Sequence, residues 1–289
     1  MKTLNQHIQE KLVINKKFNK SHDCRLVYNL DTTSRINIFY KYWECVEQYK
    51  NSVFIDGKPA ELTKFGTTKQ KYKKGDHIVE INDISNIINA SCMFEDCEDL
   101  IEAHFFEMEN VKDTSYMFYN CKYLETVIFD NLKNVENVSH MFYNCRYYFR
   151  KAPMFDTKKV KNMSWMFGDC DRLKEVPLYN TENVENMEHM FEDCNNLTGV
   201  PSFDTSKVLN MYNMFRNCTN IETVPLFDTK KVKRMWGMFS GCTNLKEVPL
   251  FHTNMFMDYS NMFYKCKNLS DETKQRWSKV YDFNKNDKK

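Results

Sequence analysis

The chain has 289 residues, with 41 Lys and Arg against 39 Asp and Glu, so its formal net charge is only +2. A charge this close to balance gives no reason to expect nucleic acid or an anionic membrane as a partner. No apolar run approaches the roughly 18 residues that a membrane-spanning helix needs, so membrane insertion is not expected.

Residues 1–20 are rich in Lys, Asn and Gln, with apolar residues about four apart at Leu4, Ile8 and Leu12. This spacing predicts a short amphipathic helix from Leu4 to about Ile14. The segment is either a docking helix for a partner or a disordered, loosely attached arm. It lacks the apolar run of a signal peptide, so a cytoplasmic location is expected.

Residues 21–84 are predicted to form a small β-rich module that caps the repeats after it. Apolar residues alternate over 24–30 and again from Ile36 to Tyr42, which favours strands, although 40–46 fits a helix equally well. Asp56-Gly57 is a strong hairpin turn pair. A last strand over 77–81 has Ile78 and Glu80 on one face and Val79 and Ile81 on the other.

Residues 85–269 contain eight copies of Met-Phe-x-x-Cys at intervals of 24 residues, with one interval of 25. A fixed period in this range is typical of stacked repeats, so we expect a solenoid of about eight coils. Coils one strand spacing apart, ~4.8 Å, would place the motif's cysteines above one another in a ladder. The cysteines of this predicted ladder are Cys97, Cys121, Cys145, Cys170, Cys194, Cys218, Cys242 and Cys266.

The middle copies read V-x-x-M-x-x-M-F-x-x-C-x-x-L-x-x-V-P-x-F-D-T. L-x-x-V is predicted to be a short strand that the Pro ends or confines to an edge. Met-Phe-x-x-Cys has the length of one helical turn, and Asp-Thr suits a capped turn. The residue before each Cys is Asp, Asn or Gly, types that tolerate a left-handed backbone, except for Lys265 in the last copy.

The cysteine ladder is interpreted as core filling by small apolar thiols, without disulfides. On this interpretation Cys194→Ser would bury a hydroxyl without a partner, at a cost of roughly 1–3 kcal/mol. The sequence contains none of the common catalytic, nucleotide-binding or zinc motifs, so no catalytic residue, metal or cofactor is predicted. We therefore expect a protein that is not an enzyme.

Residues 270–289 open with Ser270, Asp271 and Glu272, a typical helix start, and continue with Trp277, Val280 and Tyr281 as an apolar stripe. A helix that caps the last coil, followed by a frayed tail, is predicted here.

Function is expected where the repeat varies. The copy after Cys145 is one residue longer and bulkier, which makes Tyr147, Phe149 and Arg150 candidate contact residues. The exposed side of the predicted strands carries charges of both signs, which suits a flat protein-binding face. The candidates on this face are Glu125, Lys174, Glu175, Glu222, Lys246 and Glu247. Lysines within 158–161 and 230–233, near Trp165 and Trp236, are interpreted as a solvated basic edge.

The columns Val160-x-Asn162-Met163, Met166-Phe167, Cys170 and Leu173 resemble the BspA-type leucine-rich repeat family over roughly 180 residues. The resemblance implies a mainly β fold with short helical turns, wound as a right-handed leucine-rich-repeat-like solenoid. Members of that family are often surface proteins that bind other proteins or host matrix. The opening residues are also similar to those of proteins encoded by phages of gut bacteria.

These observations together predict a non-enzymatic scaffold for protein–protein interaction, with an unidentified protein partner. It would act in the cytoplasm or, if phage-encoded, in the virion. The alternative is an exported, adhesin-like surface protein that binds proteins of a host or of neighbouring cells.

Overall fold

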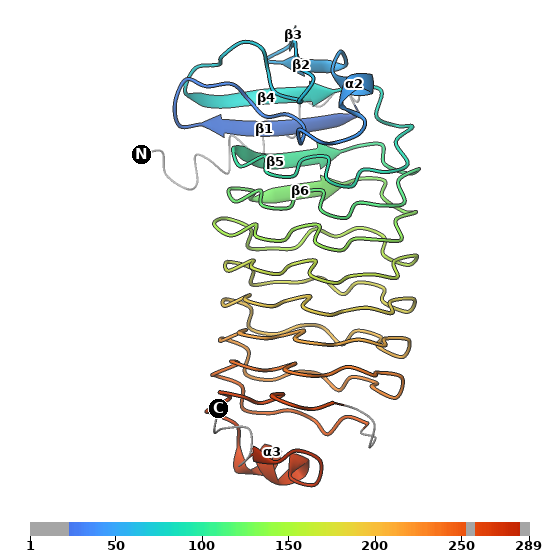
Figure 1. The fold of residues 1–289 in the computed structure, drawn as a ribbon, viewed down its shortest axis with the longest axis vertical. Coiled ribbons are helices and arrows are strands. Elements are labelled where there is room, and N and C mark those ends of the chain that lie inside the picture. The colour runs from blue at the N-terminus through green and yellow to red at the C-terminus, as the bar shows by residue number, and fades with distance from the viewer. Residues whose placement is uncertain (1–22, 253–257, 284–289) are drawn as a thin grey trace.

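The structure, a computed structural model, describes residues 23–252 and 258–283. It is mainly β and repeat-like, with few helices (Figure 1). The chain forms an elongated stack with a β-module at one end and a helix at the other. The predicted N-terminal helix at residues 4–14 lies outside the described residues.

A six-stranded sheet builds the first end of the stack, in the order β3-β2-β4-β1-β5-β6. All its pairs are antiparallel except β5 with β6, which is parallel. The strands are β1 (Cys24–Leu30), β2 (Val53–Ile55), β3 (Lys58–Pro59), β4 (Gly75–Ile81), β5 (Leu100–Phe105) and β6 (Thr126–Phe129).

Local sequence signals explain most of the β-module. Asp56 and Gly57 both have positive φ, 53° and 75°, as the tight turn between β2 and β3 requires. In β4, Val79 and Ile81 are fully buried whereas Ile78 is exposed, so the predicted alternation holds. The ambiguous stretch after Tyr40 forms turns and a short helix, α2 (Val46–Tyr49). The strand expected from Ile36 to Tyr42 is wrong, because only isolated bridges form near there, at Ser34 and Asn37.

The β-module and the repeats share their backbone pairing. β1 pairs with β5, which belongs to the first repeat, so the sheet crosses the predicted boundary at residue 84. The thiol of Cys97 lies 3.7 Å from the carbonyl oxygen of Ile38, and the ring of Phe39 stacks on Phe94. The module therefore contacts the first repeat in the way that each repeat contacts the next.

Inside the stack each repeat contributes one layer of the core. The Phe of each Met-Phe-x-x-Cys copy stacks on the Phe of the next, and the ring centroids from Phe39 to Phe263 are 5.5–6.0 Å apart. The neighbouring Met and Val side chains are buried, most of them completely. Because each layer is covered only by the layers on either side, no single repeat could bury its apolar surface alone.

The Met-Phe-x-x-Cys segment is not the predicted helical turn. In the first seven copies alternate N–H groups donate to the next coil, as from Phe94 to the Met117 carbonyl at 2.9 Å, and the intervening ones close tight turns within the coil. The residue before Cys is left-handed in every copy, from Asp96 to Gly241 and including Lys265. A second left-handed residue precedes Cys by five positions, as at Cys92. Two such residues bend the chain too sharply for a helix.

The predicted L-x-x-V strands form only in the first two repeats, as β5 and β6. Later copies keep isolated parallel bridges, such as Lys151 with Glu175 and Thr223 with Glu247. These later copies carry a Pro after the Val, as at Pro177 and Pro225, and β5 and β6 do not. Because Pro has no N–H to donate to a ladder, it limits the pairing between successive coils.

α3 (Asp271–Trp277) lies within the range where the sequence predicts a helix and packs against the last repeat. Ser270 is its N-cap and accepts a hydrogen bond from the Thr273 N–H. The Trp277 ring is fully buried, lies edge-on to Phe263 at 5.3 Å, and donates from Nε1 to the Val248 carbonyl.

Candidate interaction surface

An exposed apolar column runs along the segments that follow each Cys. We call these the strand-side segments, because β5 and β6 lie in the first two of them. In these segments the aromatic residue after Pro-x is buried, so the residue before it points outward. We call this column the apolar ridge. Its members are Ile128 (38% exposed), Met154 (60%), Leu178 (62%), Leu226 (63%) and Leu250 (45%). Ser202 occupies the corresponding position in the one intervening copy.

The ridge is exposed although every copy could carry a polar residue there, as Ser202 does. Single exposed apolar residues are ordinary on a protein surface, but a contiguous row of them marks a surface for interaction. Successive coils place neighbouring members about one strand spacing, ~4.8 Å, apart, so the ridge consists of a run of three and a run of two apolar side chains with Ser202 between them.

Five of the six predicted charged contact residues lie exposed beside this ridge: Glu125, Lys174, Glu175, Glu222 and Lys246. Glu222 pairs with Lys246 at 2.9 Å, and Glu175 pairs with Lys151 at 3.6 Å. Solvent-exposed pairs of this kind contribute little to folding stability. Their charges can instead orient a partner on the apolar ridge.

Glu247, the sixth predicted contact residue, also has a structural role. Its carboxylate accepts a hydrogen bond from the Thr273 hydroxyl at 3.0 Å. Hydrogen bonds from Ser270 and Thr273 lower the pKa of Glu247. The carboxylate thus ties the last strand-side segment to the start of α3.

The longer copy after Cys145 places its aromatic residues differently from the prediction. Phe149 is fully buried and stacks on Phe142 at 5.0 Å, so it is not a contact residue. It fills the core position that Leu occupies in other copies, because the extra residue is absorbed between Cys145 and Phe149. Tyr147 and Tyr148 are pushed outward and lie 45 and 48% exposed.

Tyr147 and Arg150 remain on the surface. Tyr147 contacts Tyr123 of the preceding coil, with ring centroids 5.2 Å apart, and Tyr148 lies 6.1 Å from the same ring. The three rings form an exposed tyrosine cluster at the start of the strand-side segments. Arg150 is exposed, and its carbonyl accepts the N–H of Lys174, which holds the irregular copy in register.

All eight motif cysteines are buried. Seven of them donate from the thiol to the Phe carbonyl of the preceding coil, as Cys194 does to Phe167 at 3.0 Å. Burial raises the pKa of Cys194 well above the usual thiol value. A protonated, enclosed thiol is a poor nucleophile and a poor metal ligand.

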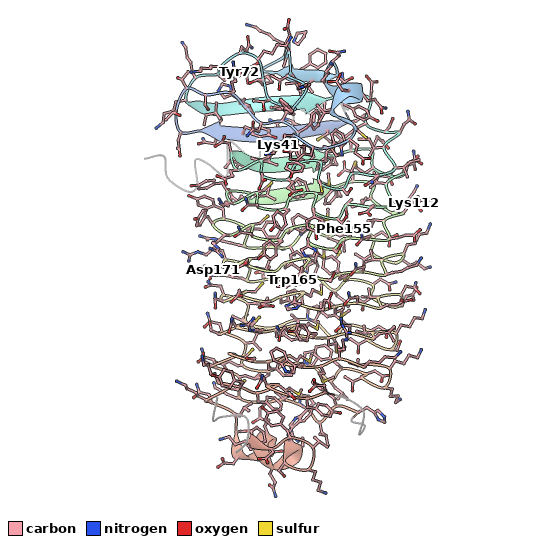
Figure 2. The ribbon with its side chains drawn as sticks, viewed as in Figure 1. Lys41, Tyr72, Lys112, Phe155, Trp165 and Asp171 are labelled. Carbon is pink, nitrogen blue, oxygen red and sulfur yellow. The ribbon has the colours of Figure 1, made fainter. Side chains whose placement is uncertain are left out.

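A stack of half-buried rings at the turns is not among the features predicted from the sequence. Four of its members are the left-handed residues five positions before Cys: Tyr116, His140, Trp165 and His189. Their ring centroids lie 4.3, 5.9 and 3.9 Å apart in that order. Figure 2 labels Trp165 midway along the stack. The sequence signal was available, since these residues share one column of the repeat.

The rings in this stack cover each other's faces and leave mainly their edges to solvent, so they stiffen the turns and do not offer a flat platform. The His189 ring bonds to the buried carboxylate of Glu192, which also accepts from Arg216 at 2.7 Å. Burial lowers the pKa of His140 to about 4, so this ring is neutral at pH 7. No pair of these groups forms a nucleophile with its base.

The described parts of the chain hold neither a metal cluster nor a membrane-spanning helix. Residues 23–252 and 258–283 contain no group of three or more His, Cys, Asp or Glu side chains placed to hold a metal ion. The same residues include no helix long and apolar enough to cross a membrane.

The geometry defines a class: a stacked-repeat protein with a buried thiol and aromatic core and a variable outer surface. The family described as "Mycoplasma protein of unknown function, DUF285" matches residues 63–178, 129–222 and 194–286, which together span most of the chain. The chain belongs to this family.

Among solved structures, the chain is similar to a leucine-rich repeat protein of T. pallidum, at 17% identity and a TM-score of 0.35. The match covers 65% of this chain and 91% of that one. No curated protein matches the sequence.

Proposed function

We propose that the protein is a non-enzymatic scaffold that binds another protein through its strand-side surface. The observation that carries this proposal is the apolar ridge, five exposed apolar side chains in register along the stack. Nothing in the folding of the coils requires apolar residues at these positions, since the neighbouring Val and aromatic side chains already fill the core. In this proposal the stack is a solenoid of eight coils, closed at one end by the β-module and at the other by α3.

The surroundings of the ridge fit a folded or extended polypeptide as the ligand. Exposed charges of both signs flank the row, from Glu125 and Lys174 to Glu222 and Lys246. A dry apolar centre with a polar, charged rim is the usual composition of a protein–protein interface. The tyrosine cluster of Tyr123, Tyr147 and Tyr148 extends the surface with the residue type most enriched at such contacts.

A binding comparison between matched variants tests this function. The tagged protein, Leu178→Asp and Leu226→Asp are used to capture partners from lysate of the source cells, with mass spectrometry as the readout. The matched control is Leu209→Asp, an exposed leucine that does not belong to the ridge. A partner lost with both ridge variants and kept with the control supports the proposal. A partner set that is the same for all four proteins, or lost equally with the control, contradicts it.

The place of action is part of the proposal. The scaffold would act in the cytoplasm or, if the gene is carried by a phage, in the virion. Resemblance to BspA-type repeats favours the alternative, an exported surface protein that binds proteins of a host or of neighbouring cells. Cell fractionation distinguishes them, because recovery only from the cell surface would contradict the intracellular proposal.

A further inference from the structure

A cavity of about 430 Å³ lies where the β-module meets the first repeat. Lys41, which lines it, is labelled near that end of the stack in Figure 2. Its lining includes three aromatic side chains that reach the surface: Tyr42 and Phe65, which are 68 and 49% exposed, and the half-buried Tyr40. Exposed rings of this size beside a cavity are not explained by folding of the module, whose core is filled by other residues.

The backbone holds these walls in place from both sides. Tyr40 donates its N–H to the Met93 carbonyl, which fixes its segment to the first coil. The loop carrying Phe65 is held by Gly66, whose carbonyl accepts the N–H groups of Ile38 and Phe39. Gly66 has φ of 74°, and a Cβ there would lie 2.7 Å from the Phe39 oxygen, so only glycine permits this approach.

The floor of the cavity is acidic. Glu95 and Asp96 of the first Met-Phe-x-x-Cys copy both line it. Asp96 accepts a hydrogen bond from the Asn120 amide, and Glu95 bonds to the Cys92 thiol. Neither carboxylate forms an ion pair with a Lys or Arg of the described residues. Burial, followed by the charges of these two carboxylates, raises the pKa of the Tyr40 hydroxyl.

Cations of the chain itself already lie over the two exposed rings. The Lys41 ammonium is 4.9 Å from the centre of the Tyr42 ring, and the Lys64 ammonium is 5.0 Å from that of Phe65. Both lysines are exposed neighbours in sequence of the rings they cover, so a ligand can displace them at small cost. Aromatic walls that attract cations lie beside two carboxylates that form no ion pair within the described residues, and this combination favours a cationic ligand with an apolar stem.

We propose that this cavity binds a lysine or arginine side chain presented by a partner polypeptide. The alkyl stem would lie against Tyr42 and Phe65, and the charged head would reach Glu95 and Asp96. That this side chain belongs to a partner protein rests on the proposed function. The cavity itself is separate from the apolar ridge. Its cation binding can therefore be measured without any partner protein.

The test titrates the full chain with N-acetyl-lysine methylamide and N-acetyl-arginine methylamide, followed by saturation-transfer NMR up to about 10 mM, since contacts of this kind give only millimolar affinity. The uncharged N-acetyl-norleucine methylamide keeps the alkyl stem and serves as the control ligand. Tyr42→Ala and Glu95→Gln are compared with Tyr147→Ala and Glu125→Gln, which change the same residue types outside the cavity. Thermal melting verifies that each variant is folded.

We expect the two cationic probes to bind and the norleucine probe not to bind. Tyr42→Ala and Glu95→Gln should each weaken binding roughly tenfold, the two controls should not, and Lys41→Ala should strengthen it by removing a competing cation. Equal binding of the norleucine probe, equal effects of Glu95→Gln and Glu125→Gln, or no binding of either cation overturns the proposal. Leu226→Asp should leave probe binding unchanged, so failure of the ridge and failure of the cavity remain distinguishable.

Discussion

The cysteine ladder gives the sharpest prediction, because the structure reverses an expectation drawn from the sequence. With the thiols interpreted as apolar filling, Cys194→Ser would leave a buried hydroxyl unpaired and cost roughly 1–3 kcal/mol. In the structure the Cys194 thiol donates to the Phe167 carbonyl at 3.0 Å, so a serine hydroxyl has an acceptor. The shorter C–O bond sets the oxygen farther back and weakens the bond, but does not abolish it.

The expected order is therefore that Cys194→Ala is more destabilising than Cys194→Ser. Serine should cost about 0.5–1 kcal/mol, for a longer bond and a less apolar atom. Alanine loses the hydrogen bond, about 0.5–1.5 kcal/mol, and leaves an atom-sized void worth about 1 kcal/mol more, about 2 in total. Near the midpoint, 1 kcal/mol shifts the melting temperature of a protein of this size by about 2–4 °C.

Thermal denaturation of the wild type, both variants and the same pair at Cys218 measures this order. Cys218 donates to Phe191 at 3.0 Å in the same way, so it should repeat the result. If serine proves more destabilising than alanine at both positions, the hydrogen-bonded ladder is wrong and the thiols serve only as apolar filling.

Three further predictions concern the turns and the C-terminal end. His140 has a folded pKa of about 4 because of burial, whereas an unfolded histidine titrates near 6.5, so the unfolded chain binds more protons between these values. Stability should fall as pH drops from about 6.5 towards 4, by on the order of 1 kcal/mol once solvent screening is included. In melts at pH 7 and pH 5, His140→Asn should remove this part of the loss. An equal loss in the variant would contradict the prediction. Gly168→Ala would place a Cβ 2.8 Å from the Trp165 ring and should destabilise the fold by about 1–3 kcal/mol. In the control Gly199→Ala the Cβ meets nothing within 4 Å, so its effect should be near neutral. Equal melting temperatures for the two variants would refute the close approach. Trp277→Ala should cost about 3–5 kcal/mol and speed amide exchange in the last coil, and unchanged protection there would show that α3 is not the cover.

The repeat could be predicted from the sequence because its signals are local and occur in every copy. The residue before each Cys is Asn, Asp or Gly in seven copies, and these types adopt the left-handed backbone at low cost. Lys265 shows the limit of that rule. It is left-handed too, because the hydrogen bonds of the neighbouring coil impose the turn on whatever residue stands there. The strands of the later copies failed as a prediction, since the short L-x-x-V pattern carries no information on how many ladder bonds its neighbours offer.

The candidate sites were harder to predict than the fold. The exposure of charged residues such as Glu222 and Lys246 follows from alternation along the strand-side segment. The same alternation places the apolar ridge on the exposed side. The burial of Phe149 and the hydrogen bond of Glu247 could not be predicted from the sequence. The first depends on where an extra residue is absorbed, and the second depends on where α3 docks. The cavity beside Tyr42 joins segments more than 50 residues apart in the chain, 37–42 and 95–96, which no local pattern relates.

The sequence by itself determined the period of the stack, the identity of its core columns and the positions of its sharp turns, because each depends on residue types within one repeat. Only the tertiary structure decided what those residues do between coils: that the buried thiols donate hydrogen bonds, that the rings at the turns stack, and that acidic and aromatic side chains enclose a cavity at the first coil. Those contacts join residues 24 or more positions apart, and their geometry exists only once neighbouring coils are in register.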